Sequence, residues 1–153
     1  MKKFSIKESN KIYSRAKKVV PGGSQTFSKG VNQFVEGFAP KYLERGKGAY
    51  SWDVDGNQFL DYVMACHPLI LGYADDDVNK AVINQLELGS TFSLMNELEV
   101  DVTELLIDSV PCAEMARFGK NGADATTVGV RIARAVTERD HIAFCGYHGW
   151  HDW

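Results

Sequence analysis

The stretch from residue 115 to residue 145 constrains the fold more than any other part of this chain. Residues 115–118 predict a short strand, and residues 119–122 predict the loop that follows it. Apolar residues then recur at helical spacing, and residues 141–145 predict a second strand; the helical positions are Ala125, Val128, Ile132, Ala133 and Val136. A strand, a helix and a strand in this order predict a βαβ unit with parallel strands and a right-handed crossover. The fold class is therefore expected to be α/β.

Two parallel strands make too small a sheet to stand alone. Parallel sheets are normally covered on both faces, so a sheet with two clear strands buries too little of itself. We therefore expect the fold to continue beyond Trp153, and we expect the 153 residues by themselves to expose apolar surface.

Upstream, the sequence predicts a helix, a long loop and a hairpin. Apolar residues at helical spacing lead to Pro21-Gly22-Gly23, which ends the first helix; they are Ile12, Ala16, Val19 and Val20. Residues 21–48 lack periodicity and carry glycine and proline repeatedly, which predicts mostly loop with one short strand at most. Alternation in residues 50–62 on both sides of Asp55-Gly56 predicts a hairpin with a tight turn.

Two further helices are predicted between the hairpin and residue 111. The first is capped within residues 75–77 and closed by Gly89, with an apolar face of Val78, Ala81, Val82 and Leu86. The second ends at Pro111 and has the apolar positions Leu98, Val102, Leu105 and Leu106.

Bulk properties exclude several classes of protein. A chain of 153 residues is long enough for one domain with a sizeable core. Its net charge of −3 provides no basic field for nucleic acid, and no apolar run approaches the ~20 residues of a membrane span. The start of the chain lacks the apolar segment of a signal peptide, and three cysteines without a CxxC pair favour a reducing, cytoplasmic setting.

The segment from Phe118 to Ala125 is the first candidate site. A strand there leads through small residues into the start of a helix, where free backbone N–H groups and the helix dipole favour an anion. Asn121 and Asp124 can cap the helix, and Gly122 lets a phosphate approach the backbone. A capped turn without a ligand, or a hairpin turn at Asn-Gly, explains the same residues. The GxGxxG and GxxxxGK spacings of nucleotide-binding loops are absent.

The second candidate site is the segment from Cys145 to Asp152. It follows the second predicted strand and is therefore expected at the carboxyl edge of the sheet, where open α/β sheets bind ligands. Tyr147 could stack on a flat ring, and His148 could orient that ring or move a proton. A metal site of Cys145, His148 and His151, or an aromatic loop with a structural role only, remains as an alternative.

Taken together, these segments resemble the amino-terminal part of a class III aminotransferase that depends on pyridoxal 5′-phosphate (PLP), in its glutamate-1-semialdehyde 2,1-aminomutase-like branch. The likeness covers essentially the whole chain and keeps its order and spacing. The matching stretches are residues 21–23, 46–57, 60–62, 70–72, 114–118, 131–134 and 146–149.

This resemblance implies the aspartate-aminotransferase-type fold, which is fold type I of the PLP-dependent transferases. Residues 1–70 would form part of the small domain and an interface arm, and residues 71–153 would begin the large PLP-binding α/β domain, which is incomplete here. The complete protein would be a homodimer with its sites at the interface.

The resemblance also implies the residues of a cofactor site. Asn121, Gly122 and Ala123 match the Ser-Gly-Thr that holds the cofactor phosphate, although the threonine hydroxyl is lost at Ala123. Tyr147 matches the aromatic residue that stacks on the pyridine ring, and His148 follows it as in the family. Cys66 replaces a tryptophan that shapes the substrate pocket, and Lys29 stands where the branch has an arginine for the substrate carboxylate. A lysine is a point charge and not a bidentate fork, so these two changes argue against glutamate 1-semialdehyde as substrate.

The implied activity is amino transfer from a small-molecule donor to a keto or aldehyde acceptor. The family's lysine that bonds the cofactor covalently would lie beyond residue 153, so this chain carries no catalytic residue and is expected to be inactive alone. Lys120 lies in the phosphate loop, on the wrong side of the cofactor to replace that lysine. An aminomutase and a non-catalytic remnant or interaction protein are the alternatives.

Overall fold

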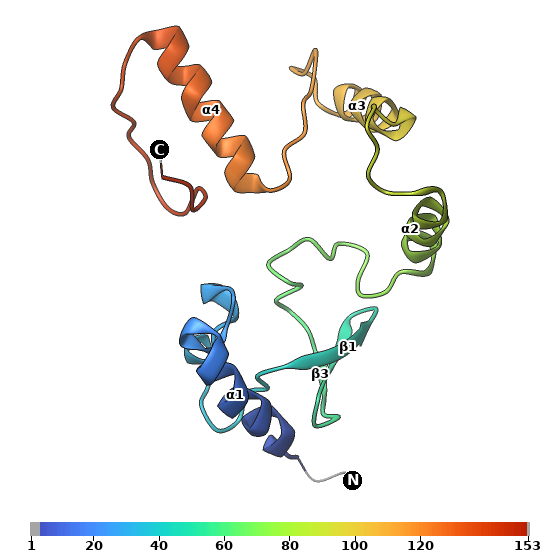
Figure 1. Ribbon diagram of the computed structural model, residues 1–153, viewed down its shortest axis with the longest axis vertical. Coiled ribbons are helices and arrows are strands. Elements are labelled where there is room, and N and C mark those ends of the chain that lie inside the picture. The colour runs from blue at the N-terminus through green and yellow to red at the C-terminus, as the bar shows by residue number, and fades with distance from the viewer. Residues whose placement is uncertain (1–3, 153) are drawn as a thin grey trace. The chain divides into compact units, whose positions relative to one another are not determined.

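The computed structural model describes residues 4–152. The chain separates into two compact units, Met1–Ser90 and Thr91–Trp153, and each is described by itself (Figure 1). The boundary expected at residue 70 separates domains of the complete family fold, and it stays a prediction.

The first unit begins with the predicted helix. Helix α1 spans Lys7–Val19 and ends where Val20 turns to extended backbone before Pro21, as expected. Residues 21–48 are more ordered than a plain loop, because they contain three short 3₁₀ helices and one strand. These are η1 (Pro21–Gly23), η2 (Phe27–Lys29), η3 (Val31–Gln33) and β1 (Leu43–Lys47).

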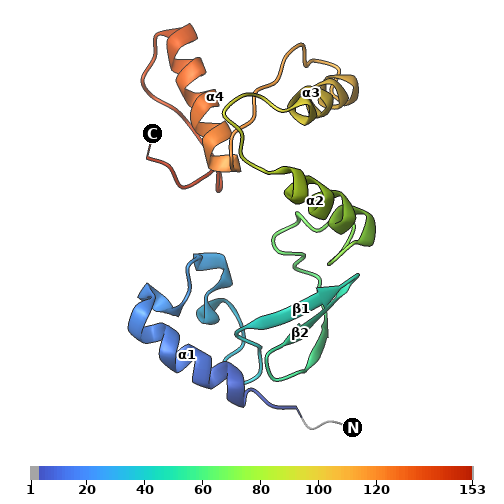
Figure 2. The same cartoon turned by 45° about the vertical axis from the view of Figure 1, so that its right-hand side comes forward.

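The predicted hairpin is present and gains β1 as a third strand. Strands β2 (Tyr50–Asp53) and β3 (Gln58–Leu60) pair antiparallel with Ser51 opposite Phe59, and β1 pairs antiparallel with β2. Figure 2 shows β1 and β2 side by side. Val54 falls in the turn and residues 61–62 lie beyond β3, so the paired region is shorter than the alternation suggested.

Two carboxylates of the hairpin turn join the sheet to α1. Asp53 is fully buried and accepts hydrogen bonds from the amides of Asp55 (3.0 Å) and Asn57 (2.7 Å), which closes the turn. The Asp55 carboxylate then accepts from the backbone N–H groups of Glu8 and Ser9, each at 2.9 Å. These N–H groups lie in the first turn of α1, whose own N-cap, Ile6, offers no side-chain acceptor. Asp55 is therefore the cap of α1, supplied from a distant part of the sequence.

This capping role lowers the pKa of Asp55. Burial acts in the opposite direction and would raise the pKa, but the N–H donors of Ser9 and Glu8 outweigh it and favour the charged form. The result is a pKa below the ordinary value of 3.8.

The first unit ends with helix α2, which spans Asp76–Leu88 within the range that the sequence predicted. Asp75 caps it by accepting from Asp77 N (3.1 Å) and Val78 N (3.0 Å), and Gly89 closes it with a φ of 110°. The connection from the sheet passes through Tyr73, whose hydroxyl donates to Asp61. Burial and then this hydrogen bond raise the pKa of Tyr73 to about 12.

The second unit contains two helices at the predicted positions. Helix α3 spans Glu97–Ser109 and begins with a capping box in which Asn96 and Glu99 accept each other's backbone N–H. Helix α4 spans Gly122–Thr137 and ends at Glu138, which adopts the left-handed conformation with a φ of 55°.

The two strands predicted on either side of α4 were wrong for this structure. Residues 115–118 and 141–145 are irregular, and the only ladder in the described part of the chain is the antiparallel sheet of the first unit. A strand exists only where a neighbouring backbone completes its hydrogen bonds, and no described residue pairs with either segment. The βαβ unit thus has its helix but not its paired strands.

Apolar side chains remain largely exposed, so the sizeable core expected from chain length is also wrong for residues 4–152. Ala123, at 6% exposure, is the one buried hydrophobic residue in that range. The predicted face of α2 is about half exposed at Val78 (47%), Val82 (52%) and Leu86 (58%), which agrees with the expected exposure of apolar surface. No helix among the described residues is long and apolar enough to cross a membrane.

Removing the charge of Asp55 tests its capping role. We expect Asp55→Asn to lower the free energy of unfolding at pH 7 by about 1 kcal/mol, because an amide NH₂ replaces one of the two accepting oxygens and leaves the N–H of Glu8 or Ser9 without an acceptor. Because the pKa of Asp55 is lowered by folding, its stabilisation is complete above pH 3.8 and is lost as the pH falls through the folded-state pKa. The difference between the two proteins, measured by urea denaturation, should therefore shrink in acid.

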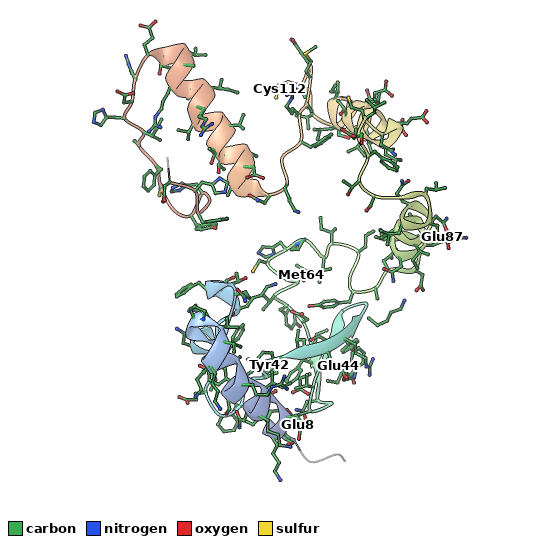
Figure 3. The ribbon with its side chains drawn as sticks, viewed as in Figure 1. Glu8, Tyr42, Glu44, Met64, Glu87 and Cys112 are labelled. Carbon is green, nitrogen blue, oxygen red and sulfur yellow. The ribbon has the colours of Figure 1, made fainter. Side chains whose placement is uncertain are left out.

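Glu44→Gln is the matched control, since Glu44 is an exposed carboxylate on β1 (Figure 3). It removes the same charge and should leave the free energy of unfolding unchanged. Equal effects of the two substitutions would contradict the capping role of Asp55.

Candidate functional site

The candidate site is built on the first turn of α4. Asn121 is the N-cap, and its side-chain oxygen accepts from the amide of Asp124 at 3.0 Å. In return, Asp124 Oδ2 accepts from the amides of Lys120 (3.0 Å) and Asn121 (3.2 Å). This capping box fixes the point at which the helix starts and the direction of its first N–H groups.

Two backbone N–H groups of this first turn take no part in the capping box. The backbone N–H groups of Gly122 and Ala123 have no hydrogen-bond partner among the described residues. A Cβ added at Gly122 would meet no atom within 4 Å, so the space outside this turn is open. Free N–H groups at the positive end of a helix, beside open space, form a favourable place for an anion.

The segment after α4 returns to this first turn, as Figures 1 and 2 both show for the red end of the chain beside α4. Gly149 makes the closest approach: a Cβ there would lie 2.9 Å from Thr126 Oγ1 and 3.1 Å from the Cα of Ala123. With a φ of 114°, Gly149 also has a backbone conformation that other residues rarely adopt. This contact explains why Ala123 is buried although it lies at a helix end.

A pocket of about 360 Å³ lies between the first turn of α4 and this returning segment. The five residues predicted to bind a cofactor all line it: Asn121, Gly122, Ala123, Tyr147 and His148. Tyr147 is 85% exposed, so its ring is available to a ligand, and the His148 ring lies 4.2 Å from that of Phe144. The structure therefore brings the two sequence segments together, and the roles of their residues remain predictions.

Sequence reasoning missed three lining residues, namely Thr126, Gly149 and Trp150. Thr126 lies one turn into α4, on the side of Gly122 and Ala123, so helical periodicity could have found it. Gly149 had a weaker signal, because its need for a positive φ depends on a packing contact that is distant in the sequence.

The predicted substrate residues lie elsewhere in the chain. Lys29 is exposed at the end of η2, and Cys66 is exposed in a turn after the hairpin, where Met64 to His67 all have positive φ. Met64 marks this turn in Figure 3. Both residues belong to the first unit and neither lines the pocket of the second, so their assignment stays a prediction. The metal alternative receives no support, since no three His, Cys, Asp or Glu side chains of residues 4–152 form a group that could hold an ion.

The pocket fits a phosphorylated aromatic ligand. The two residues with free N–H groups line the pocket and can receive a phosphate there, and Tyr147 can cover a flat ring. The hydroxyl missing at Ala123 is not replaced by Thr126, whose hydroxyl donates to the Ala123 carbonyl at 3.1 Å. The phosphate would therefore be held mainly by the backbone.

Adding a methyl group at Gly149 tests the packing of the returning segment. We expect Gly149→Ala to lower the free energy of unfolding by about 1–3 kcal/mol, because the new Cβ meets backbone and helix side chains and the positive φ is strained. Gly129→Ala, within α4 itself, is the control, since a Cβ there meets nothing within 4 Å and alanine favours a helix. A Gly149→Ala protein as stable as Gly129→Ala in thermal unfolding would contradict this packing.

Comparison with known proteins agrees with the geometry. Residues 35–152 match the family model of class III aminotransferases. The chain is 42% identical over 152 residues to 3-aminobutyryl-CoA aminotransferase of Cloacimonas acidaminovorans, covering 99% of this chain and 36% of that protein. It is 43% identical over 154 residues to glutamate-1-semialdehyde 2,1-aminomutase of Methanocaldococcus jannaschii, covering 98% of this chain and 34% of that protein. The chain thus spans about a third of the length of these relatives.

Solved structures give the same result. An omega-transaminase from Sphaerobacter thermophilus superposes with a TM-score of 0.84 at 38% identity, covering 94% of this chain and 32% of that one. A transaminase with PLP bound superposes with a TM-score of 0.88 at 31% identity, covering 98% and 35%. The predicted fold class, a portion of the fold of PLP-dependent transaminases, is confirmed. The chain belongs to the class III aminotransferase family.

Proposed function

We propose that the pocket at the start of α4 binds PLP, and that the protein transfers an amino group from a small-molecule donor to a keto or aldehyde acceptor. The observation that carries this proposal is the meeting of two free N–H groups and an exposed tyrosine ring in one pocket, in a chain of this family.

Each side of the pocket has its own task. The N–H groups of Gly122 and Ala123 bind the phosphate, and the dipole of α4 adds to their attraction. The Tyr147 ring would cover the pyridine ring, and His148 lines the same pocket. When bound, PLP supplies an electron sink for the substrate carbon. The described residues therefore hold and orient the cofactor.

The amino-transfer step also needs a lysine that bonds the cofactor covalently. No lysine among residues 4–152 lines the pocket, and Lys120, although next to it in sequence, contributes its backbone N–H to Asp124. We therefore assign residues that bind the cofactor non-covalently, and not the catalytic lysine, to this chain.

The proposed substrates are an amino donor and a keto or aldehyde acceptor. The two relatives above match this chain almost equally, at 42% and 43%, although one is named an aminotransferase and the other an aminomutase. An aminomutase is thus the second candidate, and isomerisation of glutamate 1-semialdehyde without an external acceptor would distinguish it. The replacements at Lys29 and Cys66 favour the aminotransferase.

We further propose a cytoplasmic homodimer. Its support is the exposed apolar surface of the helices, which needs cover, and the three cysteines, which are all free.

A substitution that removes one N–H group tests the phosphate site. Gly122 is the first residue of α4, where proline is well tolerated, and Asn121 has the extended backbone that must precede proline. Gly122→Pro therefore removes a donor while keeping the helix. We expect it to weaken the binding of pyridoxamine phosphate, measured by calorimetry, by roughly tenfold to a hundredfold, the value of one hydrogen bond to a charged group.

Gly122→Ala is the matched control, because it adds a Cβ at the same position, as proline does, and keeps the N–H group. Gly122→Pro should bind pyridoxamine phosphate more weakly than Gly122→Ala, since only proline removes the donor. Equal affinities of all three proteins would overturn the phosphate site.

The second test concerns turnover. Because the described part of the chain places no lysine at the pocket, we expect the 153 residues, incubated with PLP, an amino donor and a keto acid, to form no new amino acid. Amino transfer above the rate of free PLP, measured by chromatography of the products, would contradict this assignment.

A further inference from the structure

His151 links the returning segment to α4 without lining the pocket. Its Nδ1 lies 3.0 Å from Thr127 Oγ1, and its Nε2 lies 3.7 Å from Asp124 Oδ1. The side chains of His151 and Asp124 are 29% and 34% exposed. One imidazole ring thus contacts two residues of the first turns of α4.

The direction of the hydrogen bond follows from the hydroxyl of Thr127. This hydroxyl donates its only proton to the carbonyl oxygen of Ala123, at 2.7 Å. Thr127 Oγ1 can then only accept from His151, so Nδ1 carries the proton and donates. Asp124 lies too far from Nε2 for a hydrogen bond, and it attracts the ring electrostatically when the ring is protonated.

Tyr147, in contrast, has an exposed side chain. Among the described residues, no hydrogen bond or ring contact fixes its 85%-exposed ring. The backbone on both sides is permissive, since Gly146 and Gly149 have φ values of 79° and 114°. Without an anchor, this segment could take many conformations, and ordering it would weaken ligand binding.

We propose that His151 is a positioning residue, which holds Tyr147 over the pocket by fixing the segment of residues 146–151 to α4 through Thr127. The inference rests on the proposed binding of PLP. In this inference His151 affects the binding of the cofactor's ring and not of its phosphate. The N–H groups of Gly122 and Ala123 are held in place by the Asn121–Asp124 capping box, which does not involve His151.

The test compares two substitutions with two ligands. His151→Phe keeps a ring against Trp150, whose ring lies 4.8 Å away edge-on, but it removes the donor. His151→Asn loses the ring but keeps an N–H group that can reach Thr127. Pyridoxamine phosphate reports on ring and phosphate together and forms no covalent bond with a lysine, whereas inorganic phosphate reports on the N–H groups alone. Affinities are measured by calorimetry on the protein produced at the full length that its gene encodes.

We expect His151→Phe to weaken pyridoxamine phosphate by about three- to tenfold, the value of one hydrogen bond, and to leave inorganic phosphate unchanged. His151→Asn should restore most of the affinity. Equal loss for both ligands would overturn the inference, because His151 would then support the helix start. Unchanged affinity for pyridoxamine phosphate in His151→Phe would also overturn it, and the proposed function would stand. If the unchanged protein bound neither ligand, the proposed function would fail first and the inference with it.

Discussion

This structure depends on one constraint: the free backbone N–H groups at the start of each helix need a hydrogen-bond acceptor. Each of its helices α1 to α4 begins where an Asp or Asn oxygen accepts from the first turn; these residues are Asp55, Asp75, Asn96 and Asn121. Because little apolar surface is buried among residues 4–152, these polar contacts, and not a core, define where the helices start and what lies beside them.

At α4 the same constraint produces the candidate site. The side chains of Asn121 and Asp124 accept hydrogen bonds from the amides of residues 120, 121 and 124. The amides of Gly122 and Ala123 make no such bond, so they are the donors that a ligand can use. The returning segment, which approaches α4 closely at Gly149, adds Tyr147 to the same pocket. The free N–H groups and the tyrosine ring are thus placed by different interactions, which is why they can be tested separately.

The exposed apolar faces of the helices and the two unpaired segments lack partners among the described residues. Relatives of this chain are about three times as long, and the segments at 115–118 and 141–145 have no strand partners among the described residues. A helix face such as that of α2 carries the periodicity of a buried surface without the surface that would bury it. The predicted helices therefore form although their apolar faces are exposed, whereas the two predicted strands do not form without a neighbouring strand.

The sequence by itself determined the features that depend on near neighbours. Caps, periodicity and Gly or Pro stops located helices α1 to α4, Asp55-Gly56 located the hairpin, and a small-residue helix start located one wall of the pocket. Only the tertiary structure decided that Asp55 caps α1, that His151 contacts Thr127, and that the two flanking segments stay unpaired. The physical reason is range: a helix satisfies its backbone within four residues, whereas a distant cap, a loop contact or a strand needs a partner whose position no local pattern encodes.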